Sequence, residues 1–426
     1  METHQISPTH EAFSTLIGAY SRFGSDEKAV GLFSSMKEKV GSFPDVVDCN
    51  CLLKLLVEKG RFELALNMYD EMLERGLADN YSTCIAMRGL CLQRRVDGAK
   101  KLIEDRWGAG CTPNVVFYNT LIHGYFRKGD VRKGCALFRE MELKGFLPTV
   151  VTYGVVINGF VSNGNFLEVN RLMDEMKARG LNPNVEIYNT ILDALCKCGS
   201  ILEAKAVLRQ MIGGGCEPSV ITYNILISEL CRDGKVREPE QLLREAIQRR
   251  LTPNELSYTP LIHGYCKQGE VVTASNLILE MTETGDKPDI VTYGALIHGL
   301  VVTGEINEAL GIREKMIERG VHPDANMYNV LINGLCKKGM LPSAKMLLAE
   351  MLDQNICLDE YIYATLIDGF IRNGDIDEAK KVFEFMSQKG IRHDIVAYNA
   401  MIKGYCKHGM MSYAISCANK MRQDGL

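Results

Sequence analysis

The fifteen cysteines could form disulfides or bind zinc, but their spacing argues against both uses. Six of them recur at multiples of 35 residues: Cys91, Cys196, Cys231, Cys266, Cys336 and Cys406. No CxxC pair, HExxH motif or HxE followed by PCxxC is present, so a zinc site has no framework in the sequence. A free cysteine on an apolar helix packs as a small hydrophobic group. We therefore expect core thiols in a reducing compartment, with no metal and no cofactor.

The 35-residue spacing extends over almost the whole sequence. Eight segments between Val115 and Asp394 align without a gap. The predicted repeats are 10–45, 46–79, 80–114, 115–149, 150–184, 185–219, 220–254, 255–289, 290–324, 325–359, 360–394 and 395–426, the last incomplete, after a short extension of residues 1–9. Self-similarity at this period is typical of a stacked array, which grows by adding neighbours to one another. Residues 10–426 are therefore expected to form a single array.

Each repeat has the pattern of two helices joined by a turn. In the repeat of residues 360–394, four apolar residues recur at helical spacing: Tyr363, Leu366, Ile367 and Phe370. Gly374 can end that helix in the left-handed conformation, as glycine does at this place in eleven of the twelve repeats. A second apolar face follows: Ile376, Ala379, Val382, Phe383 and Met386. The sequence predicts an all-α fold, a right-handed superhelical solenoid of about twelve helical hairpins.

The composition limits the partners that can be proposed. The net charge is −4, so the overall field does not favour a nucleic acid, and such a partner would need locally placed cations. No apolar run approaches the 18 residues or more of a membrane-spanning helix. The residues before His10 include Glu2 and no arginine, which is unlike an organelle-targeting segment. Because the array also stops inside a repeat, we expect a fragment of a longer chain.

The repeat unit reads V-x-T-Y-N-x-L-I-x-G-x-C-K-x-G at its start and E-M-x-x-x-G-x-x-P-D at its end. The segment Val220-Ile-Thr-Tyr-Asn-Ile-Leu-Ile carries the first part, and Glu280-Met-Thr-Glu-Thr-Gly-Asp-Lys-Pro-Asp the second. This unit resembles the pentatricopeptide-repeat family over essentially the whole chain from His10 onward. The uniform length resembles its P-type subclass. The tetratricopeptide repeat does not fit, because its period is 34 and its W-x₂-L-G-x₂-Y pattern is absent.

The resemblance implies that the chain binds single-stranded RNA, with about one base for each repeat. It assigns base reading to the fifth and the last residue of each repeat. These residues are Asn50, Asp79, Asn119, Thr149, Gly154, Asn184, Asn189, Ser219, Asn224, Asn254, Thr259, Asp289, Gly294, Asp324, Asn329, Asp359, Ala364, Asp394 and Asn399. The fifth position alternates between amide, hydroxyl and small residues beside a recurrent tyrosine, and packing does not explain that alternation.

The chemistry of these positions suits the family's reading rules. A small fifth residue leaves room for a purine, whereas asparagine suits a pyrimidine. A terminal aspartate only accepts hydrogen bonds, which matches the ring N–H of uracil or guanine, and asparagine or serine can donate to adenine or cytosine. Thr259 with Asp289 then favours G, and Asn329 with Asp359 favours U. For the repeats of residues 115–359 the predicted core is Y-A-C-Y-G-G-U, where Y is a pyrimidine.

Two further positions support this interpretation. The second residue, which sandwiches bases in the family, is apolar in most repeats: Val47, Val116, Val151, Ile221, Leu256, Val291, Tyr361 and Val396. The thirteenth is often basic and would meet phosphates: Arg127, Lys197, Arg232, Lys267, Lys337, Arg372 and Lys407. The nine tyrosines from Tyr118 to Tyr398 at the fourth position are expected in the core.

Each feature also has a simpler explanation. A terminal Asp or Asn can cap the next helix, and a basic residue near a helix end stabilises the helix dipole. The alternatives to RNA binding are a protein-binding scaffold and a truncated array without independent function. Protein partners of an RNA-binding array also stay open. The repeats leave no room for a catalytic domain, so we expect no enzyme activity. The resemblance implies a mitochondrial or chloroplast protein that acts in RNA processing, stabilisation or translation.

Overall fold

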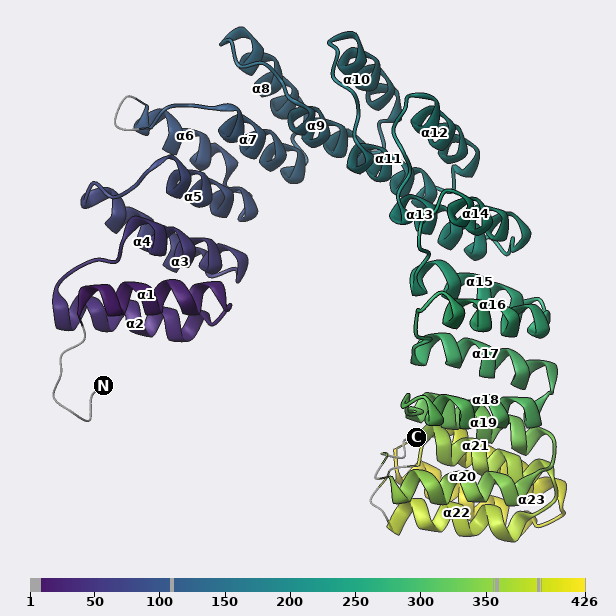
Figure 1. Ribbon diagram of the computed structural model, residues 1–426. Helices are drawn as coiled ribbons and strands as arrows, with labels where there is room; N and C mark the ends of the chain where they lie inside the picture. Colours follow the sequence, from purple (N-terminus) through teal and green to yellow (C-terminus); the bar gives the residue numbers. More distant parts are fainter. Residues whose placement is uncertain are drawn as a thin grey trace. The chain divides into compact units, whose positions relative to one another are not determined.

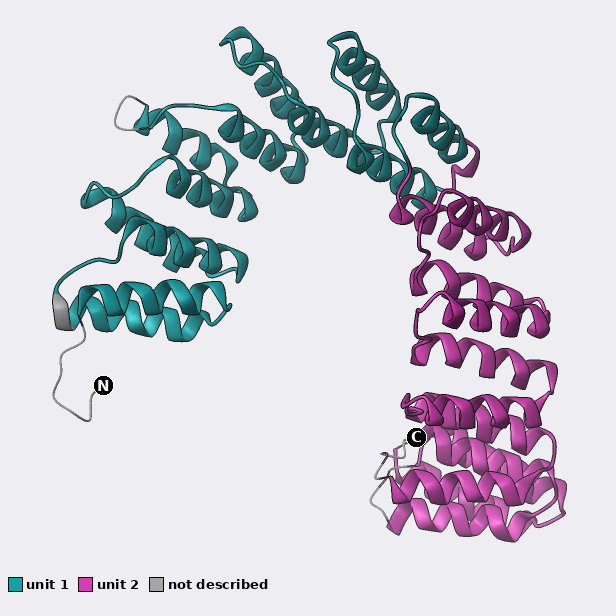
Figure 2. Cartoon of the chain, in the orientation of Figure 1, with its two compact units in different colours: residues 1–198, 203–217 teal, residues 199–202, 218–426 magenta. Residues whose placement is uncertain are grey.

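The computed structural model describes residues 9–107, 111–354, 356, 360–388, 391 and 393–425. Over these residues the chain forms 24 helices and no strand (Figure 1). The chain divides into two compact units, residues 1–198 with 203–217 and residues 199–202 with 218–426 (Figure 2). The all-α class and the helical hairpin are as the sequence predicts.

The first unit holds the helices of the first six repeats. They are α1 (His10–Arg22), α2 (Asp26–Val40), α3 (Val46–Glu58), α4 (Phe62–Glu74), α5 (Asn80–Leu92), α6 (Val96–Arg106), α7 (Val115–Lys128), α8 (Val131–Leu143), α9 (Val150–Ser162), α10 (Phe166–Ala178), α11 (Val185–Lys197) and α12 (Ile201–Gly213), whose first two residues fall in the second unit. Consecutive first helices lie side by side, α1 on α3 and so on to α9 on α11. This stacking makes a solenoid.

The second unit repeats the arrangement. Its helices are α13 (Val220–Arg232), α14 (Arg237–Gln248), α15 (Glu255–Lys267), α16 (Val271–Glu283), α17 (Ile290–Thr303), α18 (Ile306–Glu318), α19 (Ala325–Lys337), α20 (Leu341–Asp353), α21 (Glu360–Arg372), α22 (Ile376–Gln388), α23 (Ile395–Lys407) and α24 (Met411–Gln423). The first helices stack from α13 on α15 to α21 on α23. Each second helix packs against the first helix of its own repeat.

The turns between the two helices of a repeat depend on glycine. Eleven of these turns have a glycine in the left-handed conformation, for example Gly129 with φ 87° and Gly269 with φ 79°. In the repeat of residues 80–114 the place is taken by Arg94, which adopts φ 62°. A side chain with a Cβ is disfavoured there. The turn geometry is therefore kept even where the sequence offers no glycine.

The core lies where the helices of neighbouring repeats meet. The nine fourth-position tyrosines are buried, as the sequence predicts, and so are the second-helix methionines Met141, Met176, Met211, Met281, Met316 and Met351. Several of the buried tyrosine hydroxyls donate to a glutamate on the second helix of their own repeat. Tyr223 donates to Glu245 Oε1 at 2.9 Å, and Tyr153 donates to Glu175 Oε1 at 2.9 Å. These bonds join the two helices of a hairpin.

The recurrent cysteines mostly follow the expectation of core thiols, with one correction. Cys91, Cys266 and Cys336 are buried against a glycine of the following repeat, and burial raises the pKa of the Cys266 thiol to about 11. Cys406 is exposed, contrary to the expectation. Among the described residues no glycine packs against Cys406, unlike Cys91, Cys266 and Cys336. All the described cysteines are free thiols.

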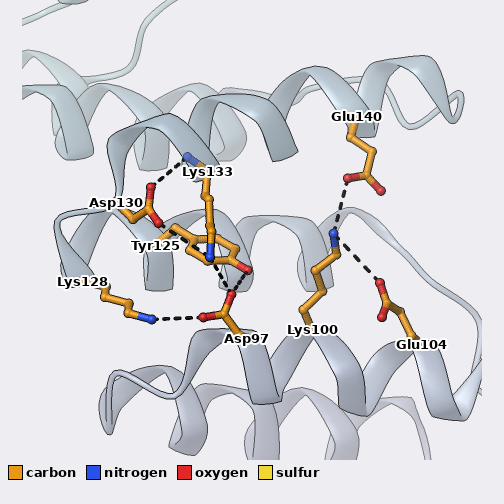
Figure 3. Close-up of polar contacts among 8 residues, drawn as sticks. All are labelled: Asp97, Lys100, Glu104, Tyr125, Lys128, Asp130, Lys133 and Glu140. Atoms are coloured by element: carbon orange, nitrogen blue, oxygen red, sulfur yellow. Dashed lines mark hydrogen bonds and ion pairs between the residues drawn. The ribbon is translucent and has the colours of Figure 1, made fainter.

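Charged side chains also connect neighbouring repeats. Asp97 on α6 accepts hydrogen bonds from Lys133 Nζ at 2.9 Å, from the Tyr125 hydroxyl at 3.0 Å and from Lys128 Nζ at 3.1 Å (Figure 3). Its three partners belong to the following repeat, on α7 and α8. They hold the pKa of Asp97 well below its usual value of 3.8. In the same view Lys100 reaches both Glu104 and Glu140.

Candidate nucleic-acid interface

The second residue of the repeats is apolar and yet exposed. The eight residues predicted to sandwich bases have 55% to 71% of their surface accessible: Val47, Val116, Val151, Ile221, Leu256, Val291, Tyr361 and Val396. Single exposed apolar residues are common on proteins. Here they recur at one position of successive first helices, which is the arrangement expected of a surface that contacts a ligand.

The fifth and the last residue of a repeat meet in both units. In the first unit, Asn50 Nδ2 lies 3.4 Å from Asp79 Oδ2. In the second unit, Asn224 Nδ2 donates to Asn254 Oδ1 at 3.0 Å. The members of each pair are about one repeat apart in sequence, yet one small ligand could touch both.

The last residue of a repeat also caps the helix that follows. Its side chain accepts a hydrogen bond from the backbone N–H three residues on: Asp79, Asn114, Thr149, Asn184, Ser219, Asn254, Asp289, Asp324 and Asp394. The capping explanation is therefore correct for these residues. In Asp289, Asp324 and Asp394 the cap uses Oδ1. Within the described residues their Oδ2 atoms carry no hydrogen bond, so capping leaves an acceptor for a ligand.

The second unit has a hollow lined by three of the predicted site residues, Val291, Gly294 and Asp324. It has a volume of about 410 Å³ and is lined by Val291, Gly294, Asp324 and Asn326, with His263 and His298 beside them. Such a volume lies within the roughly 300–1,000 Å³ of small-ligand sites. Val291 and Asn326 are the second residues of consecutive repeats, whereas Gly294 and Asp324 are the fifth and last residues of one repeat. The hollow therefore combines apolar contact, space and a carboxylate acceptor.

The two histidines were not predicted as site residues. They occupy the ninth position of their repeats, as does His123, and this recurrence of histidine is the signal in the sequence that could have marked them. Burial, Lys267 and His298 lower the pKa of His263. His263 is therefore a neutral side chain at pH 7, able to donate or accept a hydrogen bond at the edge of the hollow.

The thirteenth-position cations are all exposed. Three of them pair with a carboxylate on their own helix: Lys197 with Asp193 at 2.6 Å, Arg372 with Asp368 at 2.6 Å, and Arg232 with Glu229. The other four have no carboxylate within 4 Å in the part of the chain that the structure describes: Arg127, Lys267, Lys337 and Lys407. Arg127 lines a second hollow of about 390 Å³ together with His123 and Asn158. The unpaired cations are the better candidates for phosphate contacts.

The remaining predicted residues fall into three groups. Asn119, Gly154, Asn189, Thr259 and Asn329 are half-buried, Ala364 is buried, and Asn399 is exposed in the last repeat. Asn189 lies in the first unit and Ser219 in the second, and their pairing stays a prediction. Asp359 lies outside the described residues, and its pairing with Asn329 stays a prediction.

Two other features, a metal site and a membrane-spanning helix, have no candidate among the described residues. No group of three or more His, Cys, Asp or Glu residues that could hold a metal ion occurs among the described residues. None of the described helices combines the length and apolar character that a bilayer crossing requires. The fold is that of a helical-repeat protein.

Comparison with known families identifies the repeat. Profiles described as the PPR repeat family match residues 44–92, 113–162, 148–186, 183–232, 218–267, 253–302, 288–337, 323–370 and 393–426, and PPR repeat profiles match residues 354–387 and 11–39. These matches cover most of the sequence. The chain belongs to the PPR repeat family, the pentatricopeptide-repeat proteins.

Several curated relatives come from Arabidopsis thaliana. One pentatricopeptide repeat-containing protein is 49% identical over 123 residues, which are 29% of this chain and 15% of the relative. A chloroplastic one is 27% identical over 144 residues, 33% of this chain and 18% of the relative. A mitochondrial one is 26% identical over 151 residues, 34% of this chain and 36% of the relative. The matched segments therefore span well under two thirds of these relatives.

Two solved structures extend the comparison. The pentatricopeptide repeat protein PPR10, known from maize, in complex with an 18-nt psaJ RNA element is 22% identical, with a TM-score of 0.38 over 99% of this chain and 80% of that chain. Yeast Rmd9p in complex with a 16-nt target RNA is 11% identical, with a TM-score of 0.46 over 96% of this chain and 95% of that chain.

Proposed function

We propose that this chain is a P-type pentatricopeptide-repeat protein that binds single-stranded RNA sequence-selectively, with one base in each repeat. It acts by occupying its site in a mitochondrial or chloroplast transcript, which keeps that site unpaired and blocks nucleases, or exposes a neighbouring ribosome site. The RNA runs 5′ to 3′ from the first repeat to the last. The repeats of residues 115–359 read Y-A-C-Y-G-G-U.

The single observation that carries the proposal is the hollow beside Gly294. A base entering it would lie between Val291 and Asn326, the second residues of two consecutive repeats. Gly294 leaves the space that a purine needs, and the Asp324 carboxylate accepts from the N–H groups of guanine. Lys267 and Lys337 are exposed cations of neighbouring repeats that could neutralise the phosphates on either side. Apolar contact to the base faces gives affinity, and the polar pair gives selectivity.

A binding experiment tests the proposal. A fluorescent RNA that contains Y-A-C-Y-G-G-U should bind the purified chain more tightly than an RNA of the same composition in scrambled order. A sequence-blind result, or one insensitive to salt, contradicts the proposal, because phosphate contacts release counterions. If a protein partner stays bound to the chain after nuclease treatment has removed the RNA, a protein-binding scaffold is supported instead.

A substitution in one repeat tests the assignment of its base. Thr259→Asn fills the space beside Asp289 and should change the preferred base of that repeat from G to U. Thr259→Ser keeps a small hydroxyl residue and is the matched control, expected to retain G. A preference for G in the Thr259→Asn protein would show that the fifth residue does not read the base.

A further inference from the structure

Hydroxyl side chains recur at a position to which the base-reading rules give no role. The third residue is Ser or Thr in five repeats, and each is at most 2% exposed: Ser82, Thr152, Thr222, Ser257 and Thr292. A buried hydroxyl is costly without a hydrogen-bond partner. All five contact the last residue of the repeat before, and Ser257 and Thr292 also contact its fifth residue.

Thr292 joins the fifth and last residues of the preceding repeat. Its Oγ1 lies 2.8 Å from Thr259 Oγ1 and donates to Asp289 Oδ1, also at 2.8 Å. A threonine hydroxyl has one hydrogen, and Thr292 gives its hydrogen to the carboxylate. The Thr259 hydroxyl must therefore donate to Thr292, which leaves only acceptor lone pairs on Thr259 for a base. Thr259 and Asp289 together then present acceptors alone.

Ser257 has the opposite effect in the neighbouring repeat, where it leaves a hydrogen-bond donor for the base. Its Oγ donates to Asn224 Oδ1 at 2.6 Å, and Asn224 Nδ2 donates to Asn254 Oδ1 at 3.0 Å. Both hydrogen-bonding ends of the Asn224 amide are thereby engaged. The Asn254 oxygen is engaged as well, so its Nδ2 is the group that can face a base. This repeat presents a donor.

The third residue changes character with the fifth residue of the repeat before. Where the fifth residue is glycine, an apolar side chain stands behind it: a Cβ added to Gly154 would lie 3.5 Å from Ile187, and one added to Gly294 would lie 3.7 Å from Met327. Asn329 is an exception, since the third residue that follows is Ile362. Its Oδ1 accepts instead from Thr365 Oγ1 at 3.1 Å. A hydroxyl thus reaches this amide from another position.

We propose that the third residue of a repeat is a positioning residue that sets the hydrogen-bond polarity of the base position in the preceding repeat. The inference rests on the proposed function, because it concerns how a base is chosen. Guanine offers two N–H donors at its Watson–Crick edge, where adenine has a ring acceptor. Thr292 therefore favours G over A at the Thr259 position. Cytosine has a ring acceptor where uracil has an N–H, so Ser257 favours C over U at the Asn224 position.

The chain contains a matched control. The Thr152 hydroxyl also contacts the residue that caps its helix: it accepts from Thr149 N at 3.1 Å and lies 3.2 Å from Thr149 Oγ1, whereas Thr292 contacts its cap residue through Asp289 Oδ1. Thr152 does not, however, bond the fifth residue, since the buried Asn119 Oδ1 has no hydrogen-bond partner. Thr152→Val and Thr292→Val thus each replace a buried third-position hydroxyl that contacts a helix-cap residue by a methyl group of similar size. Only Thr292→Val removes a hydrogen bond to the fifth residue of the preceding repeat, Thr259.

The experiment compares RNAs that differ only in the fifth base of Y-A-C-Y-G-G-U, G or A. Thr292→Val should lower the ratio of the two affinities by about three- to tenfold, the worth of one hydrogen bond. Thr292→Ser should keep the ratio. Thr152→Val should also lower the melting temperature, and it should leave the pyrimidine preference at the first base of the core unchanged.

The outcomes separate the two proposals. A wild-type chain that does not prefer the predicted RNA over its scrambled form overturns the proposed function, and this inference with it. If the wild type prefers the predicted RNA and Thr292→Val keeps the wild-type ratio, only the role of Thr292 is overturned. The same holds if Thr152→Val loses as much base preference as Thr292→Val, because the effect would then be one of helix stability.

Discussion

Asn224 donates a hydrogen bond from Nδ2 to Oδ1 of Asn254, across 3.0 Å, although one residue begins the repeat and the other ends it. The bond brings the fifth and last positions of a repeat to one place on the surface. It also determines which groups stay available, because the oxygen of each amide is already engaged. The chemistry at this place can thus be changed at Asn254 without changing its role as a helix cap.

Asn254→Asp should change the preferred base of its repeat from C to U. The substitution replaces the remaining amide donor by a carboxylate acceptor, which matches the ring N–H of uracil. Aspartate caps a helix about as well as asparagine, so the melting temperature should stay the same. Affinities for RNAs with C or U at the fourth base of the core measure the change, expected at about tenfold for a charge-assisted hydrogen bond. An unchanged C-to-U ratio would contradict the assignment of Asn254.

The exposed cations should differ in their effect on salt dependence. Lys267→Ala and Lys337→Ala should each reduce the slope of log affinity against log salt by about 0.7, the value for one phosphate contact of a single strand. Lys197→Ala should change it less, because Lys197 Nζ already lies 2.6 Å from Asp193 Oδ2. Titrations at three or more salt concentrations measure the slopes. Equal slopes for all three variants and the wild type would exclude these lysines from the phosphate path.

The sequence predicts those parts of the fold that every repeat must satisfy. The buried tyrosines, the second-helix methionines and the glycine turns recur at one spacing, so twelve copies of one pattern reveal their role. The exposed second residue, such as Val291, was predicted through the family resemblance alone. Ile290 beside it is equally apolar, and only the helix geometry separates the two residues. Repetition is thus informative about packing, and less so about the surface.

Features that depend on a contact between repeats could not be predicted so well. The role of Thr292 depends on reaching Thr259 in the repeat before, and each repeat considered alone offers only a hydroxyl on a helix. Cys406 follows the core pattern but is exposed, because its position needs a glycine from a following helix. Lys197 likewise follows the pattern of phosphate-binding cations, but it already forms an ion pair with Asp193. For Thr292, Cys406 and Lys197 alike, the role of the side chain depends on which residues surround it and not on its residue type alone.

Arg94→Gly should stabilise the chain. Arg94 adopts φ 62° at the turn where the other repeats have glycine, and its backbone N–H donates to Cys91 O at 3.0 Å as part of that turn. Because its side chain is exposed, glycine would relieve the backbone strain and lose no packing. The expected gain is about 0.5–1 kcal/mol, partly offset by the greater freedom of glycine in the unfolded chain. Thermal melting measures it, with Gly129→Ala as a control that should lower the melting temperature. A lower melting temperature for Arg94→Gly would contradict the strain.

The Asp97 cluster should make the stability of the first unit depend on pH. Lys133, Lys128 and Tyr125 hold the pKa of Asp97 below its usual 3.8, so the folded state binds the proton less readily than the unfolded chain. The contribution of Asp97 is therefore fully present above pH 3.8, and it is lost as the pH falls from there through the lowered folded value. Because the carboxylate is largely exposed, Asp97→Asn should cost roughly 0.5–1 kcal/mol at neutral pH.

Melting curves at several pH values test this dependence. The difference between wild type and Asp97→Asn should be constant from pH 7 to about pH 5 and shrink towards pH 3, since a protonated Asp97 resembles asparagine in charge. Asp105→Asn, which changes an exposed carboxylate on the same helix, is the matched control and should show a smaller difference at every pH. A difference for Asp97→Asn that grows on acidification has the wrong sign for a lowered pKa. That result would mean that Asp97 is not held ionised by the lysines of the following repeat.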